Sequence, residues 1–210
     1  MGRDLDQKRI SLTDLARQQG GYFTAAQAVA IGFDNANQFR FAADGRWERV
    51  RRGIFRLASE PLSSDADLHI TSLFFRRRDG SHGGIFGLET AARIHGLGNF
   101  MPDSIQVLIE GRLRKRAELP PGVEVIRTYD ISTEVETIDG LLVTSPIRTI
   151  ADLLGALDRD EEEVRRAFVA GRQAGIISND KIAKMDQCLP AEVVAIIRNW
   201  KVGSSRIKYR

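Results

Sequence analysis

The first part of the chain alternates short apolar segments with glycines and helix-capping residues. Apolar side chains from Ile10 to Ala16 recur at helical spacing and stop before Gly20-Gly21, which predicts a first helix. Thr24 and Gln27 form a capping-box pattern, in which the hydroxyl accepts the Gln27 amide proton and the Gln27 side chain bonds back to the backbone. A second helix is therefore expected over residues 25–31, ended by Gly32.

The segment that follows predicts a third helix and a hairpin. Asp34 can cap a helix over residues 35–43, and Gly45 ends it. Two short strands come next, at 47–50 and 54–57, joined by Arg51-Arg52-Gly53. Gly53 suits a tight turn because glycine adopts positive φ without steric cost. Three short helices followed by a basic hairpin are the element order of a winged helix-turn-helix, predicted here for residues 1–60.

Residues 61–210 predict a second domain, entered through a linker at Ser59–Ser64 that contains Pro61. Ser145 as a cap with Pro146 at the first helical position opens one of its helices. The expected strands are 85–86, 105–109, 123–129 and 141–143, and the expected helices are 65–77, 88–95, 147–157, 160–174, one from 178 and 190–200. The predicted fold class is therefore α+β, with an N-terminal winged helix-turn-helix followed by a mixed α/β domain.

Composition excludes several classes of protein. The chain has 210 residues, of which 42% are hydrophobic, and its net charge is +3, which is a folding rather than a disordered composition. The longest aliphatic run, Val193 to Ile197, is far shorter than the roughly 20 residues of a membrane span, and Met1 to Asp14 has no secretory apolar core. Cys188 is the single cysteine, so no disulfide framework is available. We expect a cytoplasmic protein without a membrane partner.

The positive charge is concentrated near the predicted hairpin. Residues 1–60 hold ten basic and seven acidic side chains, whereas residues 61–210 hold 21 of each. The segment from Asn35 to Leu57 carries six arginines against two acidic residues, Asp44 and Glu48. A solvated charged face is one interpretation, and a nucleic-acid contact is the other.

The predicted third helix and hairpin carry side chains suited to double-stranded DNA. In a winged helix-turn-helix the third helix lies in the major groove, where amides pair with adenine edges and arginine with guanine. Hairpin arginines would contact phosphates, which position the protein without reading sequence. The predicted DNA-binding residues are Asn35, Asn37, Gln38, Arg40, Arg46, Arg49, Arg51 and Arg52.

Two other functions stay open from the residues alone. Winged helices also serve as protein-binding modules, and a metal-dependent nuclease needs paired carboxylates, for which Asp103 and Glu110, with the nearby Arg112, are the candidates. A basic loop at Arg112, Arg114, Lys115 and Arg116 is either solvated or in contact with a partner. The histidines and the cysteine are not at metal-ligand spacing, and no glycine-rich nucleotide loop is present, so we expect no enzyme, cofactor or metal.

The stretch from Leu15 to Leu57 resembles the N-terminal domain of the AbiEi family, which comprises antitoxins and transcriptional regulators of type IV toxin–antitoxin systems. The resemblance is carried by the step Gly20 to Thr24, by Gly32 and Gly45, and by "RVRRGIFRL" from Arg49 to Leu57. The second domain resembles the family's C-terminal region in "ETAARIHGL" (89–97) and "DGLLVTSPIRTIADLL" (139–154).

This resemblance implies a function. The first domain would bind inverted repeats in the promoter of its own operon and repress it. The second would counter a nucleotidyltransferase-like toxin encoded beside it, with or without direct binding, in a role that includes phage defence. Arg148 and Asp152, four residues apart within the second of the C-terminal motifs, are expected to pair and to fix their helix on the sheet.

Overall fold

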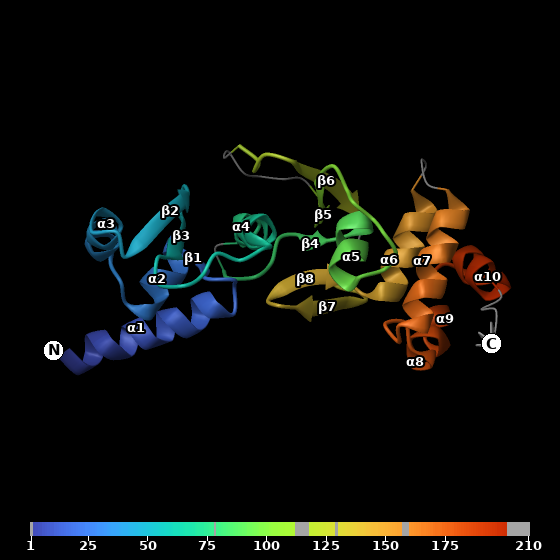
Figure 1. Cartoon of the computed structure of the whole chain (residues 1–210), viewed down its shortest axis with the longest axis horizontal. Coiled ribbons are helices and arrows are strands. Elements are labelled where there is room, and N and C mark those ends of the chain that lie inside the picture. Colours follow the sequence, from blue (N-terminus) through green and yellow to red (C-terminus); the bar gives the residue numbers. More distant parts are fainter. Residues whose placement is uncertain (1, 78, 112–117, 129, 157–159, 201–210) are drawn as a thin grey trace, which may run out of the picture.

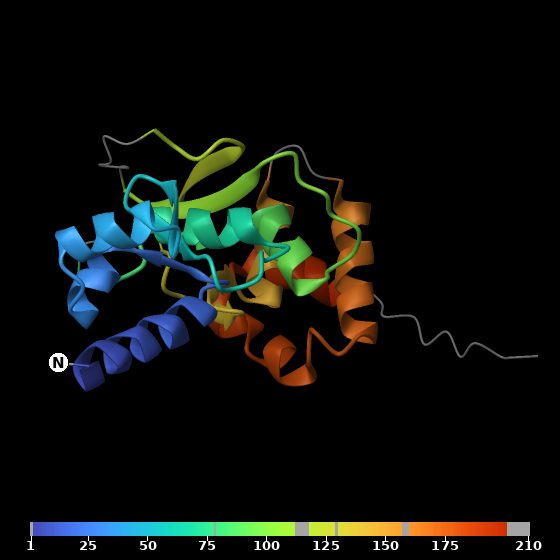
Figure 2. The same ribbon diagram turned by 60° about the vertical axis from the view of Figure 1, so that its left-hand side comes forward.

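The computed structural model describes residues 2–77, 79–111, 118–128, 130–156 and 160–200. It shows a mixed architecture of helices and two β-sheets, arranged along one long axis (Figure 1). None of the helices in these ranges is long and apolar enough to cross a membrane. Helix α1 lies at one end of the molecule and helices α7 to α10 at the other, as the turned view also shows (Figure 2).

The N-terminal elements follow the predicted order, with one addition. They are α1 (Gly2–Arg17), β1 (Tyr22–Thr24), α2 (Ala25–Ile31), α3 (Asn35–Ala43), β2 (Trp47–Arg51) and β3 (Ile54–Leu57). Both bonds of the capping box form, at 3.1 Å from the Gln27 amide to the Thr24 hydroxyl and 2.8 Å in return. Asp34 caps α3 through the Asn37 amide at 2.7 Å. Strand β1 was not predicted, because three residues are too few to show an alternating pattern.

The first sheet has the strand order β1-β3-β2, with antiparallel pairing throughout. Its central strand β3 is buried on both faces. On one face, Phe55 and Leu57 join the core formed with α1, α2 and α3. There Trp47 packs edge-to-face against Phe23 and Phe33 and at a tilt against Phe41, at ring-centroid distances of 4.8–5.4 Å. This aromatic cluster fixes α3 against the β2–β3 hairpin.

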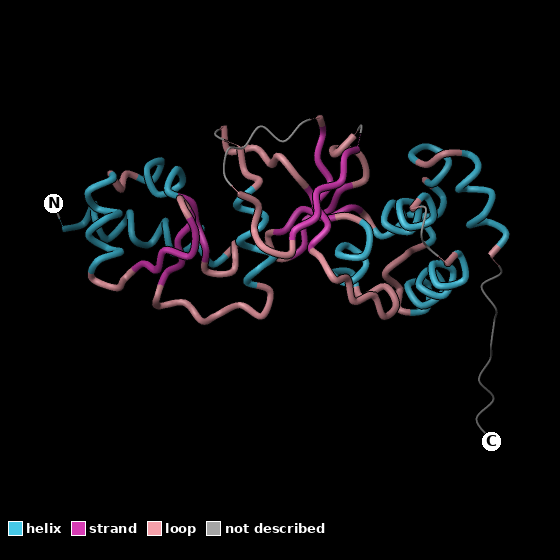
Figure 3. Tube along the Cα trace, turned by 90° about the horizontal axis from the view of Figure 1, so that it is seen from above, coloured by secondary structure: helices cyan, strands magenta, loops and turns pink. Residues whose placement is uncertain are grey.

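The opposite face of the first sheet packs on the second part of the chain. Tyr22 and Ile54 share a hydrophobic cluster with α4 (Ala66–Phe74) and with residues of the second sheet such as Val107 and Val143. Figure 3 shows α4 between the two sheets, which are drawn in magenta. The residues before and after the predicted linker therefore share one of the cores.

The second sheet has five strands in the order β6-β5-β4-β8-β7. Its strands are β4 (Ile85–Phe86), β5 (Ile105–Glu110), β6 (Val123–Thr128), β7 (Val135–Ile138) and β8 (Leu141–Thr144). The predicted third strand ended at Tyr129, which lies outside the described residues. Strand β7 was not predicted. It pairs with β8 through the predicted turn, where Asp139 and Gly140 both have positive φ, as the tight hairpin turn requires.

The remaining helices lie toward the C-terminal end of the molecule, on the far side of this sheet from α1 (Figure 1). They are α5 (Leu88–His95), α6 (Pro146–Gly155), α7 (Glu161–Gln173), α8 (Asn179–Ala183), α9 (Met185–Cys188) and α10 (Ala191–Asn199). Ser145 caps α6 with Pro146 in its first turn, as predicted. Their cluster of buried side chains includes Ile150 of α6, Phe168 of α7 and Ile197 of α10. The predicted α6 reached Leu157, which lies outside the described residues.

Candidate nucleic-acid interface

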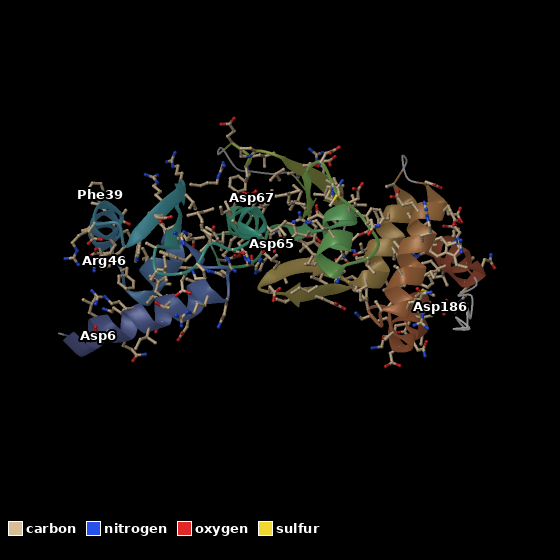
Figure 4. The ribbon with its side chains drawn as sticks, in the orientation of Figure 1. Asp6, Phe39, Arg46, Asp65, Asp67 and Asp186 are labelled. Carbon is tan, nitrogen blue, oxygen red and sulfur yellow. The ribbon has the colours of Figure 1, made fainter. Side chains whose placement is uncertain are left out.

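Helix α3 has a buried face and an exposed face. Phe41 lies in the aromatic cluster at 2% exposure, whereas Phe39 on the opposite side is 80% exposed. Asn35, one helical turn before Phe39, is exposed on the same side, and Arg40 is exposed beside it, with its guanidinium 5.1 Å from the Phe41 ring centroid. In Figure 4, Phe39 extends from the side of α3 that faces away from α1. The outer face of α3 therefore presents an aromatic ring together with an amide and a guanidinium.

Gln38 does not belong to this outer face, which corrects the prediction that it reads bases. Its side chain is 6% exposed, and its amide donates to the carbonyls of Ala25 at 3.2 Å and Phe33 at 3.4 Å. Phe33 and Ala25 belong to the turn and the helix that precede α3. Gln38 therefore ties α3 to α2 and has no amide proton pointing outward.

The other two predicted polar residues of α3 interact with each other. Arg40 donates through Nη2 to the side-chain oxygen of Asn37 at 3.0 Å. Asn37 is half-buried, and its backbone amide is taken by the Asp34 cap. Arg40 stays on the surface, with its other guanidinium protons available to a ligand.

Two of the six arginines in this region have acidic partners. Arg46 is paired with Asp44 and stacks over the Phe41 ring at 3.9 Å, and this pairing lowers the pKa of Asp44. Arg56 is buried at 7% exposure, pairs with Glu48 at 2.8 Å and donates to the Glu60 carbonyl at 2.5 Å. Arg56 therefore serves the fold, and Arg46 is partly neutralised.

The hairpin arginines differ from one another. Arg51 donates to the Glu118 carbonyl at 3.1 Å and lies over the Phe74 ring at 5.8 Å, so it holds the hairpin against the second part of the chain. Arg49 and Arg52 are exposed and have no partner among the residues that the structure describes. In this region, Arg49 and Arg52 are therefore the arginines whose side chains make no polar contact within the described part of the fold.

The predicted pair in the second part of the chain forms inside the fold. Arg148 is 9% exposed, and its guanidinium donates to the carbonyls of Thr133 and, at 2.6 Å, of Asp130. Its Nε lies 3.5 Å from Asp152 Oδ2. Burial raises the pKa of Asp152 to about 6. The pair forms as predicted, but it ties α6 to the loop before β7 rather than to the sheet.

The carboxylates considered for a nuclease are not brought together. Asp103 precedes β5 and Glu110 ends it, so the strand separates them by about 16 Å or more, too far to share one ion. Glu110 accepts instead from the Ile131 amide at 3.0 Å. Across the described ranges, no group of three or more acidic, histidine or cysteine residues is arranged to hold a metal ion. Arg112, like Arg114, Lys115 and Arg116 of the basic loop, lies outside the described residues.

Sequence reasoning did not assign Phe39 to the outer face, although the sequence carries the signal. At 3.6 residues per turn, two positions correspond to a rotation of about 200°, so Phe39 must face opposite to Phe41. The same rule places Gln38, three positions before Phe41, on the buried face. Choosing Phe41 as the core reference would have given both assignments.

Comparison with protein families matches residues 11–58 to the family described as transcriptional regulator, AbiEi antitoxin. The matched segment runs from within α1 to the end of the hairpin and contains the whole interface described above. No curated protein matches the chain. The resemblance of residues 89–97 and 139–154 to the family's C-terminal region stays a prediction. Over this N-terminal segment, the chain is similar to the AbiEi family of antitoxin transcriptional regulators.

Proposed function

We propose that residues 1–60 form a winged helix-turn-helix that binds double-stranded promoter DNA at inverted repeats and represses its own operon. Helix α3 enters the major groove with Asn35 and Arg40 toward the bases, and the β2–β3 hairpin lies on the flanking phosphates. The observation that carries this proposal is the exposure of Arg49 and Arg52 without partners among the described residues, beside a helix whose outer face is free of the core.

The electrostatics of the region support a polyanionic partner. Each phosphate contact by a cation releases counterions, which gives sequence-independent affinity and strong dependence on salt. Arg46 supplements this surface from the start of β2, although Asp44 offsets part of its charge. Arg51 contributes to the same surface with the donors that the Glu118 carbonyl does not occupy.

For residues 61–210 we propose the antitoxin activity of a type IV system, directed against a nucleotidyltransferase-like toxin. The support is the match of residues 11–58 to an antitoxin family, together with the second folded part that accompanies them. A stable complex with the toxin is not required by this proposal. Arg148 and Asp152 contribute by holding α6 in place, and no catalytic role is assigned to them.

A salt titration of promoter binding tests the DNA-binding proposal. The probe is a fluorescent duplex from the region upstream of the gene, and the variant is Arg49→Ala/Arg52→Ala. If both arginines contact phosphates, the variant loses ten-fold or more in affinity at physiological salt, and the slope of log K against log salt falls by about 1.8. The unfolding free energy should stay within about 0.5 kcal/mol of the wild type, because neither side chain has a partner among the residues that the structure describes.

The matched control is Arg165→Ala/Arg166→Ala on α7, which removes the same charge far from the interface. It should leave the slope unchanged. Equal affinity and equal slope for the hairpin variant and the wild type would reject the hairpin assignment. Failure of the wild type to bind its promoter at 50 mM salt would reject the DNA-binding function as a whole and favour a protein-binding module.

A further inference from the structure

The exposed ring of Phe39 lies at the middle of α3 and takes no part in folding. Its side chain is 80% exposed, whereas the helix is held by Phe41 and Gln38 on the other side. Ala36 and Ala43, three positions before and four after it, are also exposed on this face. A stripe of small side chains therefore flanks one large aromatic ring.

A single exposed apolar residue is common on protein surfaces and does not by itself indicate a function. The location of Phe39 is the reason to consider one. Phe39 is next to Arg40, on the element that the proposed function inserts into the major groove. Under the proposed function the partner of this face is polyanionic, and Arg49 and Arg52 on the adjacent hairpin, which have no counterion among the described residues, can contact it. An apolar side chain at such an interface needs an apolar group on the nucleic acid.

In the major groove, only one kind of base carries an apolar group. Each base pair offers hydrogen-bond donors and acceptors there, but thymine alone adds a methyl group, at C5, and phenylalanine and alanine side chains are suited to contact it. The alanines have no long side chain to hold the helix backbone away from the base edges. Asn35, one turn before Phe39, and Arg40, beside it on the exposed surface, can bond to the edges of neighbouring purines.

We propose that Phe39 is a specificity-determining residue that contacts the 5-methyl group of thymine in the operator. The inference rests on the proposed DNA-binding function and deepens it. It predicts that recognition by α3 has two parts, one polar through Asn35 and Arg40 and one apolar through Phe39. The apolar part distinguishes thymine from cytosine and from uracil.

The test uses promoter duplexes in which thymines of one half-site are replaced by deoxyuridine, which removes the methyl group and keeps every hydrogen bond. The full-length wild type should lose about four-fold in affinity for each methyl group it contacts. Phe39→Ala should bind the thymine duplex about ten-fold more weakly and should lose nothing further on deoxyuridine DNA. Phe39→Leu, which keeps an apolar side chain, should retain part of the sensitivity to deoxyuridine.

The matched control is Leu62→Ala, since Leu62 is 75% exposed and lies outside α3. It should behave as the wild type on both duplexes. A wild type that binds the promoter but loses nothing on deoxyuridine DNA overturns the inference, as does a deoxyuridine loss that persists undiminished in Phe39→Ala. Sedimentation of the wild type and of Phe39→Ala is measured in parallel. If Phe39→Ala loses a dimer that the wild type forms and stays sensitive to deoxyuridine, the ring contacts a second copy of the chain and not DNA. A wild type that binds no promoter DNA overturns the proposed function instead, and the inference with it.

Discussion

The hairpin and helix α6 use the same kind of residue in opposite ways. Arg52 is exposed and has no partner in the described part of the chain, whereas Arg148 is 9% exposed and donates to two carbonyls of its own chain beside Asp152. Removing Arg148 would leave buried acceptors and a buried carboxylate without a cation. Removing Arg52 changes no contact within the described fold.

This difference shows why a count of charges overstates a binding surface. The segment 35–57 carries six arginines, but Arg56 is buried against Glu48 and Arg46 is paired with Asp44. The excess therefore belongs to the remaining arginines, and it is fully available to a ligand only at Arg49 and Arg52. An arginine that is paired within the fold contributes to the structure. An exposed arginine without a partner in the described fold is the better candidate for binding a ligand.

Arg148→Ala gives the largest expected effect on stability. Truncation of one member of a buried, hydrogen-bonded ion pair typically costs about 3–5 kcal/mol, because the other member is left uncompensated. Urea denaturation should show this loss, while promoter affinity per folded molecule stays that of the wild type. Arg93→Ala is the matched control, since Arg93 pairs with Asp65 at 3.5 Å on the surface, and it should cost less than about 1 kcal/mol. Similar losses of stability for the two variants would contradict the contrast between the buried Arg148 pair and the exposed Arg93 pair.

The titration of Asp152 gives the next largest effect. Burial raises its pKa from 3.8 to about 6, so the fold favours the protonated form. This contribution is complete below pH 4 and is lost as pH rises through 6, which amounts to about 3 kcal/mol above pH 7. Asp152→Asn, which cannot ionise, should therefore gain stability over the wild type between pH 5 and pH 7.5.

The measurement is the difference in unfolding free energy between the two proteins at each pH. Burial also lowers the pKa of His69, His82 and His95, so these histidines oppose the trend in each protein. Their contribution cancels in the difference. A pH-independent difference would show that the Arg148 guanidinium keeps the Asp152 carboxylate ionised without cost.

Local patterns predicted the elements whose ends are determined by neighbouring residues. Thr24 with Gln27, Asp34, and Ser145 with Pro146 each placed a helix start correctly. The contacts of Arg148 could not be predicted in this way, because its carbonyl partners lie 15 and 18 residues earlier in a loop.

Other contacts depend on distant residues in the same way. His95, at the end of α5, is half-buried, its pKa is lowered by burial, and its Nε2 lies 2.7 Å from the Thr144 carbonyl. Of the candidate interface, the hairpin and α3 were found from sequence, whereas the roles of Gln38 and Phe39 needed the position of the core.

Replacing the amide side chains of Gln38 and Asn35 in α3 should have effects of intermediate size. Gln38→Ala leaves the carbonyls of Ala25 and Phe33 without a donor and should cost about 1–2 kcal/mol. Asn35→Ala, at an exposed position, should change stability by less than about 0.5 kcal/mol and should weaken promoter binding instead. Thermal unfolding and binding of both variants test this pair. If Asn35→Ala proves the more destabilising variant, the assignment of the two faces of α3 is wrong.

Arg51 is expected to have a small effect on stability and to stand between the structural and the unpaired arginines. It donates to an exposed carbonyl and lies at the edge of a cation–π distance from Phe74, so Arg51→Ala should cost about 0.5–1 kcal/mol. Arg52→Ala should cost nothing measurable by the same urea titration. In the salt titration of promoter binding, Arg52→Ala should lower the slope by about 0.9 and Arg51→Ala by less, because the Glu118 carbonyl occupies one of its donors. The two variants could instead show equal slopes while the difference in stability between them is preserved. Arg51 would then support the fold and contact a phosphate at once. The division between structural and functional arginines would fail at this residue.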